Sequence, residues 1–286
     1  MEKCAAVHSH LWEASQADFR MSLGRRVRVK TDEEVELIRL SSLLVGRTLA
    51  QVAARVEPGV TTLDLDAVAE EFIRDHGAEP GFKGYGGFPN SLCTSVNEAV
   101  VHGIPNDTPL QNGDIVSVDC GVLMNGFYGD SAYTFEWGEV SPEVHDLLEA
   151  TKKCLDLAIE QLWSASASAT LDLPVSSTRK PRLRGGSRVG GHGLGKDLHE
   201  APEVPNYGRR GNGPKLMDGM VLAIEPMINL GTREVGQAED GWTIVTRDGA
   251  VSAHFEHDIV VRQGKADVLS SFKDIEEILN SKNELS

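Results

Sequence analysis

The stretch GDIVSVDCGVLMNGFYGDSAYTF, residues 113–135, places two acidic side chains, Asp119 and Asp130, within strand-like sequence. Asn125-Gly126 is the strongest two-residue hairpin signal, because both positions tolerate positive φ. A hairpin folded about that turn pairs Gly121 with Asp130, and alternation of faces puts Asp119 on the same side. The two acids are then diagonal neighbours roughly 7–8 Å apart at Cα. Gly121 is expected to leave the space between them empty.

Two carboxylates so close in a half-buried sheet repel each other and are costly to remove from water. One explanation is that this face of the hairpin is solvated. The interpretation we favour is that a cation lies between Asp119 and Asp130.

Three further residues extend this set. Glu225 ends the apolar run MVLAI, and Glu256 lies in SAHFEHDIVV, where alternation gives it the same face as His254 and Asp258. His192 lies between glycines in GGHGLG. Taken alone, Glu225 could pair with an arginine and His192 could be a loop residue. Together with the two aspartates they form a mixed O/N ligand set that can hold two divalent ions and favours Mn, Fe, Co or Zn.

Two segments of the chain look alike. NGDIVSVD (112–119) and DGMVLAIE (218–225) both combine a glycine turn, an apolar run and a terminal acid. A His-Gly pair precedes each, at His102 and His192, and a further acid follows in a strand. This pattern suggests two copies of one unit facing each other across a pseudo-twofold axis.

The remaining pattern predicts an α+β domain. Helices are expected over 31–56, 61–77 and 141–162, the first with a Thr31–Glu34 capping box and the third capped by Ser141. Short β-rich runs are expected at 114–120, 127–135, 219–230, 242–247 and 251–262. Helices followed by hairpins favour mostly antiparallel strands.

Composition excludes several classes of protein. The chain has 286 residues, 40% of them hydrophobic, which is enough for a sizeable core. A net charge of −15 argues against nucleic-acid or anionic-membrane binding. The four cysteines are scattered, as in reduced cytosolic proteins. No uncharged apolar run approaches the ~18 residues of a membrane span, and residues 1–30 are expected to be a disordered extension.

The chain closely resembles type I methionine aminopeptidase from about residue 30 to 262. The motifs that carry the resemblance are KGYGGFPNSLCTSVNEAVVHGIP (83–105), the 113–135 stretch, GGHGLGKDLHEAPEVPNYG (190–208), DGMVLAIEPMIN (218–229) and GWTIVTRDGAVSAHFEHDIVV (241–261). The resemblance implies the pita-bread fold, with two pseudo-twofold α/β halves around a curved antiparallel sheet. It also implies a cytoplasmic monomer that removes the initiator methionine from nascent polypeptides, with transient ribosome contact and no nucleic-acid or membrane partner.

The resemblance also implies site roles, motif by motif. The metal ligands for two divalent ions (Co, Mn, Fe or Zn) would be Asp119, Asp130, His192, Glu225 and Glu256. The general base would be Glu225, with His102 and His199 acting on the substrate; a role for His199 in orienting other groups is the alternative. The methionine pocket would be lined by Tyr85, Phe88, Cys93 and Trp242. Leu198 stands where a Phe is usual, and Gly86 where a larger residue often stands.

One segment, 162–190, departs from the family pattern. It is rich in Ser, Ala and Arg and lacks helical apolar periodicity. Suitable codons read out of frame give family-like sequence at both of its ends, so we hypothesise compensating frameshifts; a natural loop replacement is the rival. Resequencing the coding DNA distinguishes the two.

The catalytic domain is expected over 31–264, with 265–286 as a C-terminal tail or short helix. Two alternatives to the aminopeptidase remain from sequence. One is an Xaa-Pro peptidase of the same fold, and the other is an impaired product or binding protein resulting from the altered segment.

Overall fold

The computed structural model describes residues 27–55, 59–164, 184–185, 190–206 and 215–284. Its helices are α2 (Asp32–Ala54), α3 (Thr62–Asp75), the short 3-10 helix η1 (Tyr85–Gly87), α4 (Pro142–Ser164) and α5 (Lys273–Asn283). Its strands are β1 (Glu79–Pro80), β2 (Leu92–Val96), β3 (Ala99–Val101), β4 (Ile115–Met124), β5 (Phe127–Glu136), β6 (Arg184–Gly185), β7 (Gly190–Gly193), β8 (Glu200–Pro205), β9 (Val221–Ile224), β10 (Met227–Asn229), β11 (Val235–Gln237), β12 (Ile244–Thr246), β13 (Ser252–His254), β14 (His257–Arg262) and β15 (Lys265–Val268).

Every strand pair among the described residues is antiparallel, as predicted. Strand β4 is central to one sheet, flanked by β5 on one side and by β2 and β1 on the other. Strand β9 is central to a second sheet of order β15-β14-β9-β7-β8. The two segments that look alike in sequence, 112–119 and 218–225, therefore supply the central strands of the two largest sheets.

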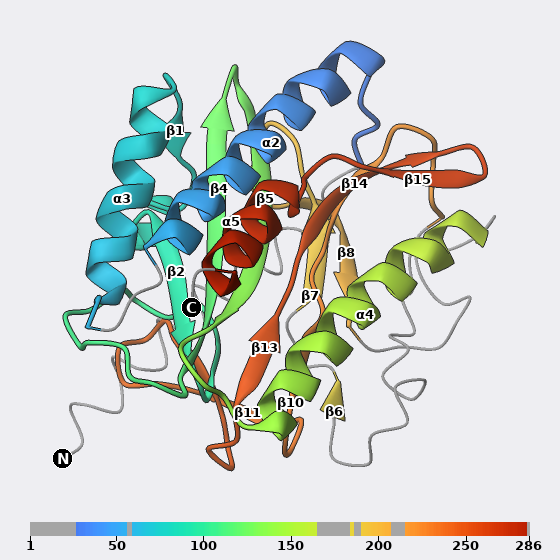
Figure 1. Cartoon of the computed structure of the whole chain (residues 1–286). Helices are drawn as coiled ribbons and strands as arrows, with labels where there is room; N and C mark the ends of the chain where they lie inside the picture. Colours follow the sequence, from blue (N-terminus) through green and yellow to red (C-terminus); the bar gives the residue numbers. More distant parts are fainter. Residues whose placement is uncertain (1–26, 56–58, 165–183, 186–189, 207–214, 285–286) are drawn as a thin grey trace, which may run out of the picture.

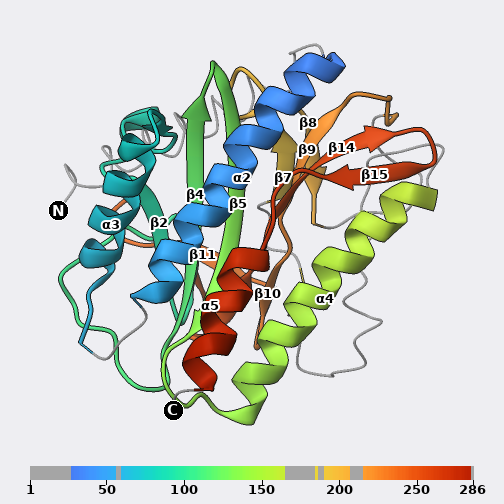
Figure 2. The same cartoon turned by 45° about the horizontal axis from the view of Figure 1, so that its top comes forward.

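Helices α2, α4 and α5 run across one face of the sheets (Figures 1 and 2). The Thr31–Glu34 capping box forms as predicted, and the amide of Val144 donates to Ser141 at the start of α4. Helix α2 is long and apolar enough to span a membrane, but 61% of its apolar window is buried. Its apolar residues contact β4, β5 and α5, so it is a core helix of this fold.

The β4–β5 hairpin has the predicted register, with Met124 opposite Phe127 and Gly121 opposite Asp130. A Cβ on Gly129 would lie 2.3 Å from the Ser42 amide nitrogen, so α2 covers that face and the neighbouring Asp130 side chain points to the other. One expectation was wrong. Gly121 leaves no empty space, because the Phe82 ring packs over it, 2.6 Å from where a Cβ would lie.

The two large sheets meet where β5 lies beside residues 254–258. The amide of Glu256 donates to the Ala132 carbonyl at 3.0 Å. The hydroxyl of Thr134 donates to the carbonyl of His254 at 2.7 Å and accepts from its amide at 2.9 Å. These contacts place the acid of β5 and the acid between β13 and β14 at one seam.

The C-terminal segment is part of the described fold: the expectation over 265–286 was a tail or a short helix, and the helix forms as α5 (Lys273–Asn283). Strand β15 extends the second sheet by pairing with β14, and α5 packs against α2. The reason is apolar content: Ala266, Leu269, Phe272 and Ile275 are buried.

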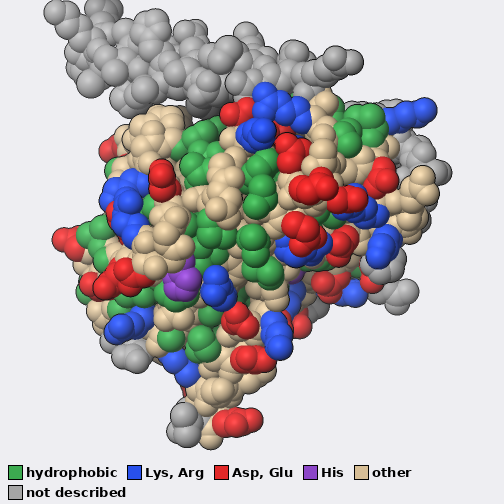
Figure 3. Space-filling model, turned by 90° about the horizontal axis from the view of Figure 1, so that it is seen from above, with side chains coloured by type: hydrophobic (Ala, Val, Ile, Leu, Met, Phe, Trp, Pro, Cys, Tyr) green, Lys and Arg blue, Asp and Glu red, His purple; other side chains and the backbone are tan. Residues whose placement is uncertain are grey.

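Two other sequence expectations fall mainly on residues outside the described ranges. These are the extension over 1–30, of which 27–30 are described, and the atypical segment over 162–190. Of the latter, Gly185 pairs with Ile228 in β10. Figure 3 shows acidic and basic side chains interspersed with hydrophobic ones, so the net charge of −15 is not gathered into one acidic patch on the described part of that face.

Candidate active site

Three buried side chains converge at the seam between the sheets. Ligand atoms of Asp130 on β5, His192 on β7 and Glu256 between β13 and β14 all lie within 4.8 Å of one another. His192 Nε2 is 3.9 Å from Asp130 Oδ2. Residues more than sixty positions apart in the chain therefore present oxygen and nitrogen donors to one small volume.

The other two acids singled out in the sequence adjoin this trio. The carboxyl groups of Asp119 and Asp130 share a hydrogen bond, and Glu225 Oε1 lies 4.0 Å from His192 Nε2. The structure thus brings all five predicted ligand residues together. Their assignment as ligands stays a prediction.

The acids are held in surroundings that oppose their ionisation. Burial raises the pKa of Asp119 to about 7. Burial, together with the neighbouring carboxylates, also raises the pKa values of Asp130, Glu225 and Glu256 well above their usual range. Such shifts are the expected result of crowding acids in a dry site.

Several oxygens of this cluster have no hydrogen-bond partner: Asp119 Oδ1, Asp130 Oδ1 and Glu256 Oε1 are all buried and unsatisfied. Unpartnered buried carboxylate oxygens are costly unless a cation compensates them. The donor set, oxygens with one imidazole, suits divalent ions such as Mn, Fe, Co or Zn. The residues present therefore fit a divalent metal.

Two further histidines stand at the site. His199 lies with its ring centroid 4.2 Å from that of His192, and its Nδ1 is 2.8 Å from the Tyr85 hydroxyl. Desolvation within the site, together with His192 and His102, lowers the pKa of His199, although the residue as a whole is exposed. Burial lowers the pKa of His102 to about 4, and its backbone is left-handed, with φ of 59°. Both imidazoles are therefore neutral near pH 7.

The predicted pocket residues form an apolar wall. Phe88 and Trp242 meet edge to face with centroids 5.2 Å apart, and Cys93 is paired with Asp119 across β2 and β4. A Cβ on Gly86 would lie 3.5 Å from the Trp242 ring, so the glycine leaves that ring uncrowded. Tyr85 is 42% exposed. Leu198 is buried in the same apolar cluster as Phe88 and Cys93.

Sequence reasoning missed two residues that adjoin the acids. His254 Nε2 lies 3.6 Å from Glu225 Oε2 and 3.8 Å from Glu256 Oε2. Asp258 Oδ2 accepts from the Asp130 amide at 2.7 Å and from the Ser42 hydroxyl at 2.6 Å. The signal was present, since alternation had already put His254, Glu256 and Asp258 on one face.

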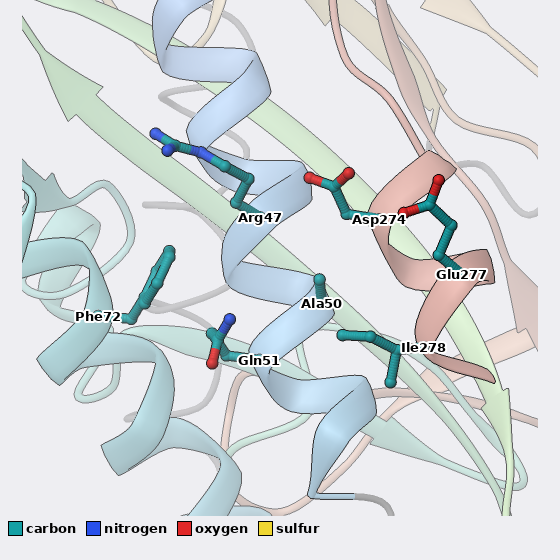
Figure 4. A pocket seen from close by; sticks show the side chains of 7 residues that line it. All are labelled: Arg47, Ala50, Gln51, Phe72, Asp274, Glu277 and Ile278. Carbon is teal, nitrogen blue, oxygen red and sulfur yellow. The ribbon is translucent and has the colours of Figure 1, made fainter. Parts of the chain in front are cut away.

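A separate pocket of about 280 Å³ lies between α2, α3 and α5, away from the acids (Figure 4). Arg47, Asp274 and Glu277 contribute its charged side chains, and Phe72, Ala50 and Ile278 its apolar ones. None of the predicted site residues lines it.

Comparisons with known proteins give a consistent result. The family model described as metallopeptidase family M24 matches residues 36–263. A methionine aminopeptidase of Clostridium perfringens is 45% identical over 248 residues, covering 86% of this chain and 99% of that protein. A crystal structure of methionine aminopeptidase from Rickettsia prowazekii has a TM-score of 0.82 at 36% identity, over 86% of this chain and 100% of the other. A prolidase from Pyrococcus furiosus shares the fold, with a TM-score of 0.66 at 20% identity, over 85% of this chain and 65% of its own.

Proposed function

The chain belongs to metallopeptidase family M24, within its methionine aminopeptidases, and on that basis we propose that it removes the initiator methionine from new polypeptides. The observation that carries the proposal is the convergence of Asp119, Asp130, His192, Glu225 and Glu256, with three buried carboxylate oxygens unpartnered. The proposed ligands are these five residues, and the proposed occupants are two divalent ions of Co, Mn, Fe or Zn.

Divalent ions held there would supply a Lewis acid for the scissile carbonyl and a lowered pKa for the attacking water. Glu225 is the proposed general base, because its carboxylate reaches both His192 and His254 and so lies inside the cluster. It would take a proton from the water and return it to the leaving amine. A neutral His199 would donate through Nε2 to the developing oxyanion, with Tyr85 at its other nitrogen. His102 would act on the leaving nitrogen.

The apolar wall would select the side chain of the substrate's first residue. Phe88, Cys93 and Trp242 offer an apolar, partly aromatic surface suited to an unbranched thioether, and sulfur–aromatic contacts favour methionine there. A small second residue is the expected preference. The expected substrates are N-termini of nascent chains.

Two alternatives follow from the same fold. An Xaa-Pro peptidase is not favoured, since the likeness to prolidase is 20% in sequence, against 45% to a methionine aminopeptidase. The other alternative is a catalytically impaired protein. It depends on the atypical segment over 162–190, whose residues 165–183 and 186–189 are outside the described ranges.

Turnover assays test the proposal. Metal-free protein is supplied with Mn, Co or Fe and given Met-Ala-Ser or an Xaa-Pro peptide. We expect metal-dependent release of methionine from Met-Ala-Ser. Cleavage of the proline peptide alone would overturn the assignment, and no cleavage of either would favour the impaired product.

The remaining properties are proposals of the same kind. We propose a cytoplasmic monomer that contacts the ribosome transiently and has no nucleic-acid or membrane partner. The acidic balance of −15 and the three described cysteines, all free and buried, support this setting.

A further inference from the structure

His254 occupies a position between two of the acids that the proposed function leaves unused. Its Nε2 lies 3.6 Å from Glu225 Oε2 and 3.8 Å from Glu256 Oε2. The side chain is 1% exposed, and Nε2 has no hydrogen-bond partner. A ring nitrogen so deeply buried and directed at two carboxylates is not explained by core packing alone.

The surrounding backbone fixes this ring in place. Both the amide and the carbonyl of His254 are hydrogen-bonded to the Thr134 hydroxyl. His254 also pairs with Met227 in the β10–β13 ladder. The ring is therefore held at the seam by β5 on one side and β10 on the other.

The two oxygens of Glu225 face different imidazoles. Oε1 lies 4.0 Å from His192 Nε2, whereas Oε2 lies 3.6 Å from His254 Nε2. His192 belongs to the trio of donors that lie within 4.8 Å of one another, and His254 does not. This arrangement assigns different tasks to the two rings, with His192 among the ligands and His254 behind them.

We infer that His254 is a positioning residue whose Nε2–H points at the carboxylates of Glu225 and Glu256, 3.6 Å and 3.8 Å away, and by electrostatic attraction holds both at the separation that metal binding requires. The inference rests on the proposed function. Ionised carboxylates only accept hydrogen bonds, so the proton must be on Nε2. Groups that orient metal ligands in this way typically change metal affinity by about 10–100-fold when removed.

Calorimetric titration of the metal-free protein with Mn²⁺ tests the inference. We expect His254→Leu to weaken binding by about 10–100-fold. We expect His254→Gln, which retains an N–H donor, to stay within about threefold of the unsubstituted protein. The matched control is His257→Gln, because His257 faces away from the acids and stacks on Phe272 with centroids 3.9 Å apart; its metal affinity should be unchanged.

Three results would overturn the inference. Unweakened binding by folded His254→Leu is the first. The second is equal loss in both His254 variants with a changed nitrogen signal in spectra of bound Cu²⁺, which would make His254 a ligand. The third needs no variant: ¹⁵N NMR of the metal-free protein, at an alkaline pH where the Glu225 and Glu256 carboxylates are ionised, should show the His254 proton on Nε2, and a proton on Nδ1 excludes the role.

A separate variant distinguishes failure of this inference from failure of the proposed function. If the unsubstituted protein binds Mn²⁺ and Asp119→Asn weakens it while His254→Leu does not, only the inference fails. If the unsubstituted protein binds no metal, the proposed function fails, and the inference fails with it.

Discussion

Lys30 Nζ lies 2.8 Å from Glu200 Oε2, and both side chains are only 4% exposed. The other oxygen of Glu200 accepts from the amide of Lys196 at 2.9 Å. This buried ion pair therefore ties the chain before α2 to the loop that carries His199, the residue next to Glu200. Its geometry links the stability of the fold to the placement of a proposed catalytic group.

Lys30→Met should destabilise the protein strongly, because it removes the buried cation of Glu200 and leaves only Arg28, whose Nη1 lies 3.5 Å from Glu200 Oε1 on a side chain that is 55% exposed. Breaking a buried pair from one side costs about 3–5 kcal/mol. Adding Glu200→Gln should recover most of that loss, since the amide oxygen can still accept from the loop. Urea unfolding measures both variants. Lys196→Met is the control: its ion pair with Glu34 is 61% and 31% exposed and should contribute little. Equal unfolding free energies for the single and double variants would contradict the prediction.

Asp119→Asn and Glu225→Gln should each abolish turnover, lowering kcat/KM by about 10² to 10³-fold or more. Each substitution keeps the volume of the side chain but removes its negative charge, so Asp119 is lost as a proposed ligand and Glu225 as the proposed ligand and general base. The metal-free variants should remain folded, because a neutral amide avoids the repulsion among the buried acids. Glu71→Gln, an exposed acid of α3, is the control. Appreciable turnover by either site variant would count against the assigned roles.

Tyr85→Phe should lower kcat by up to about tenfold and leave KM for methionyl peptides nearly unchanged. The aromatic ring of residue 85 remains, but the 2.8 Å contact between its hydroxyl and His199 Nδ1 is lost. Under the proposed mechanism, that contact would orient His199 for the transition state. Steady-state kinetics measures the split, with Tyr128→Phe as a control on β5. A raised KM at constant kcat would show that Tyr85 only lines the pocket.

The metal-free protein should lose stability as the pH rises from about 6.5 through 7. The lower bound of this window is the ordinary histidine pKa and the upper bound is the raised pKa of Asp119. The pKa of Asp119 rises from 3.8 to about 7 on folding, so the folded state binds more protons than the unfolded state in this range. The buried histidines have the opposite effect on stability, but only below pH 6.5. Burial lowers the pKa of His192 to about 4, so near pH 6.5 only the unfolded state takes up a proton there.

Thermal unfolding at a series of pH values measures this effect. Asp119→Asn should reduce the slope, and saturating Mn²⁺ should raise the stability most at the alkaline end, where the carboxylates are ionised. A metal-free protein whose stability increases steadily from pH 6.5 to 8 would contradict the pKa shifts of the acid cluster.

The local sequence pattern was sufficient to predict the β4–β5 hairpin and the start of helix α2. Asn125-Gly126 set the hairpin turn and with it the register that pairs Gly121 with Asp130, and the period-two alternation then put Asp119 on the same face. The Thr31 capping box fixed the start of α2. Each of these is a short-range effect, in which a few adjacent residues limit the backbone to one conformation.

Tertiary structure decided what lies around those acids. Phe82 fills the space above Gly121, His254 stands behind Glu225, and Asp258 holds the amide of Asp130. These contacts join residues far apart in the chain, and no local rule gives the depth or angle at which two sheets meet. The acidic residues and their faces follow from the sequence, whereas their common burial and raised pKa values arise only when β5 is packed against residues 254–258.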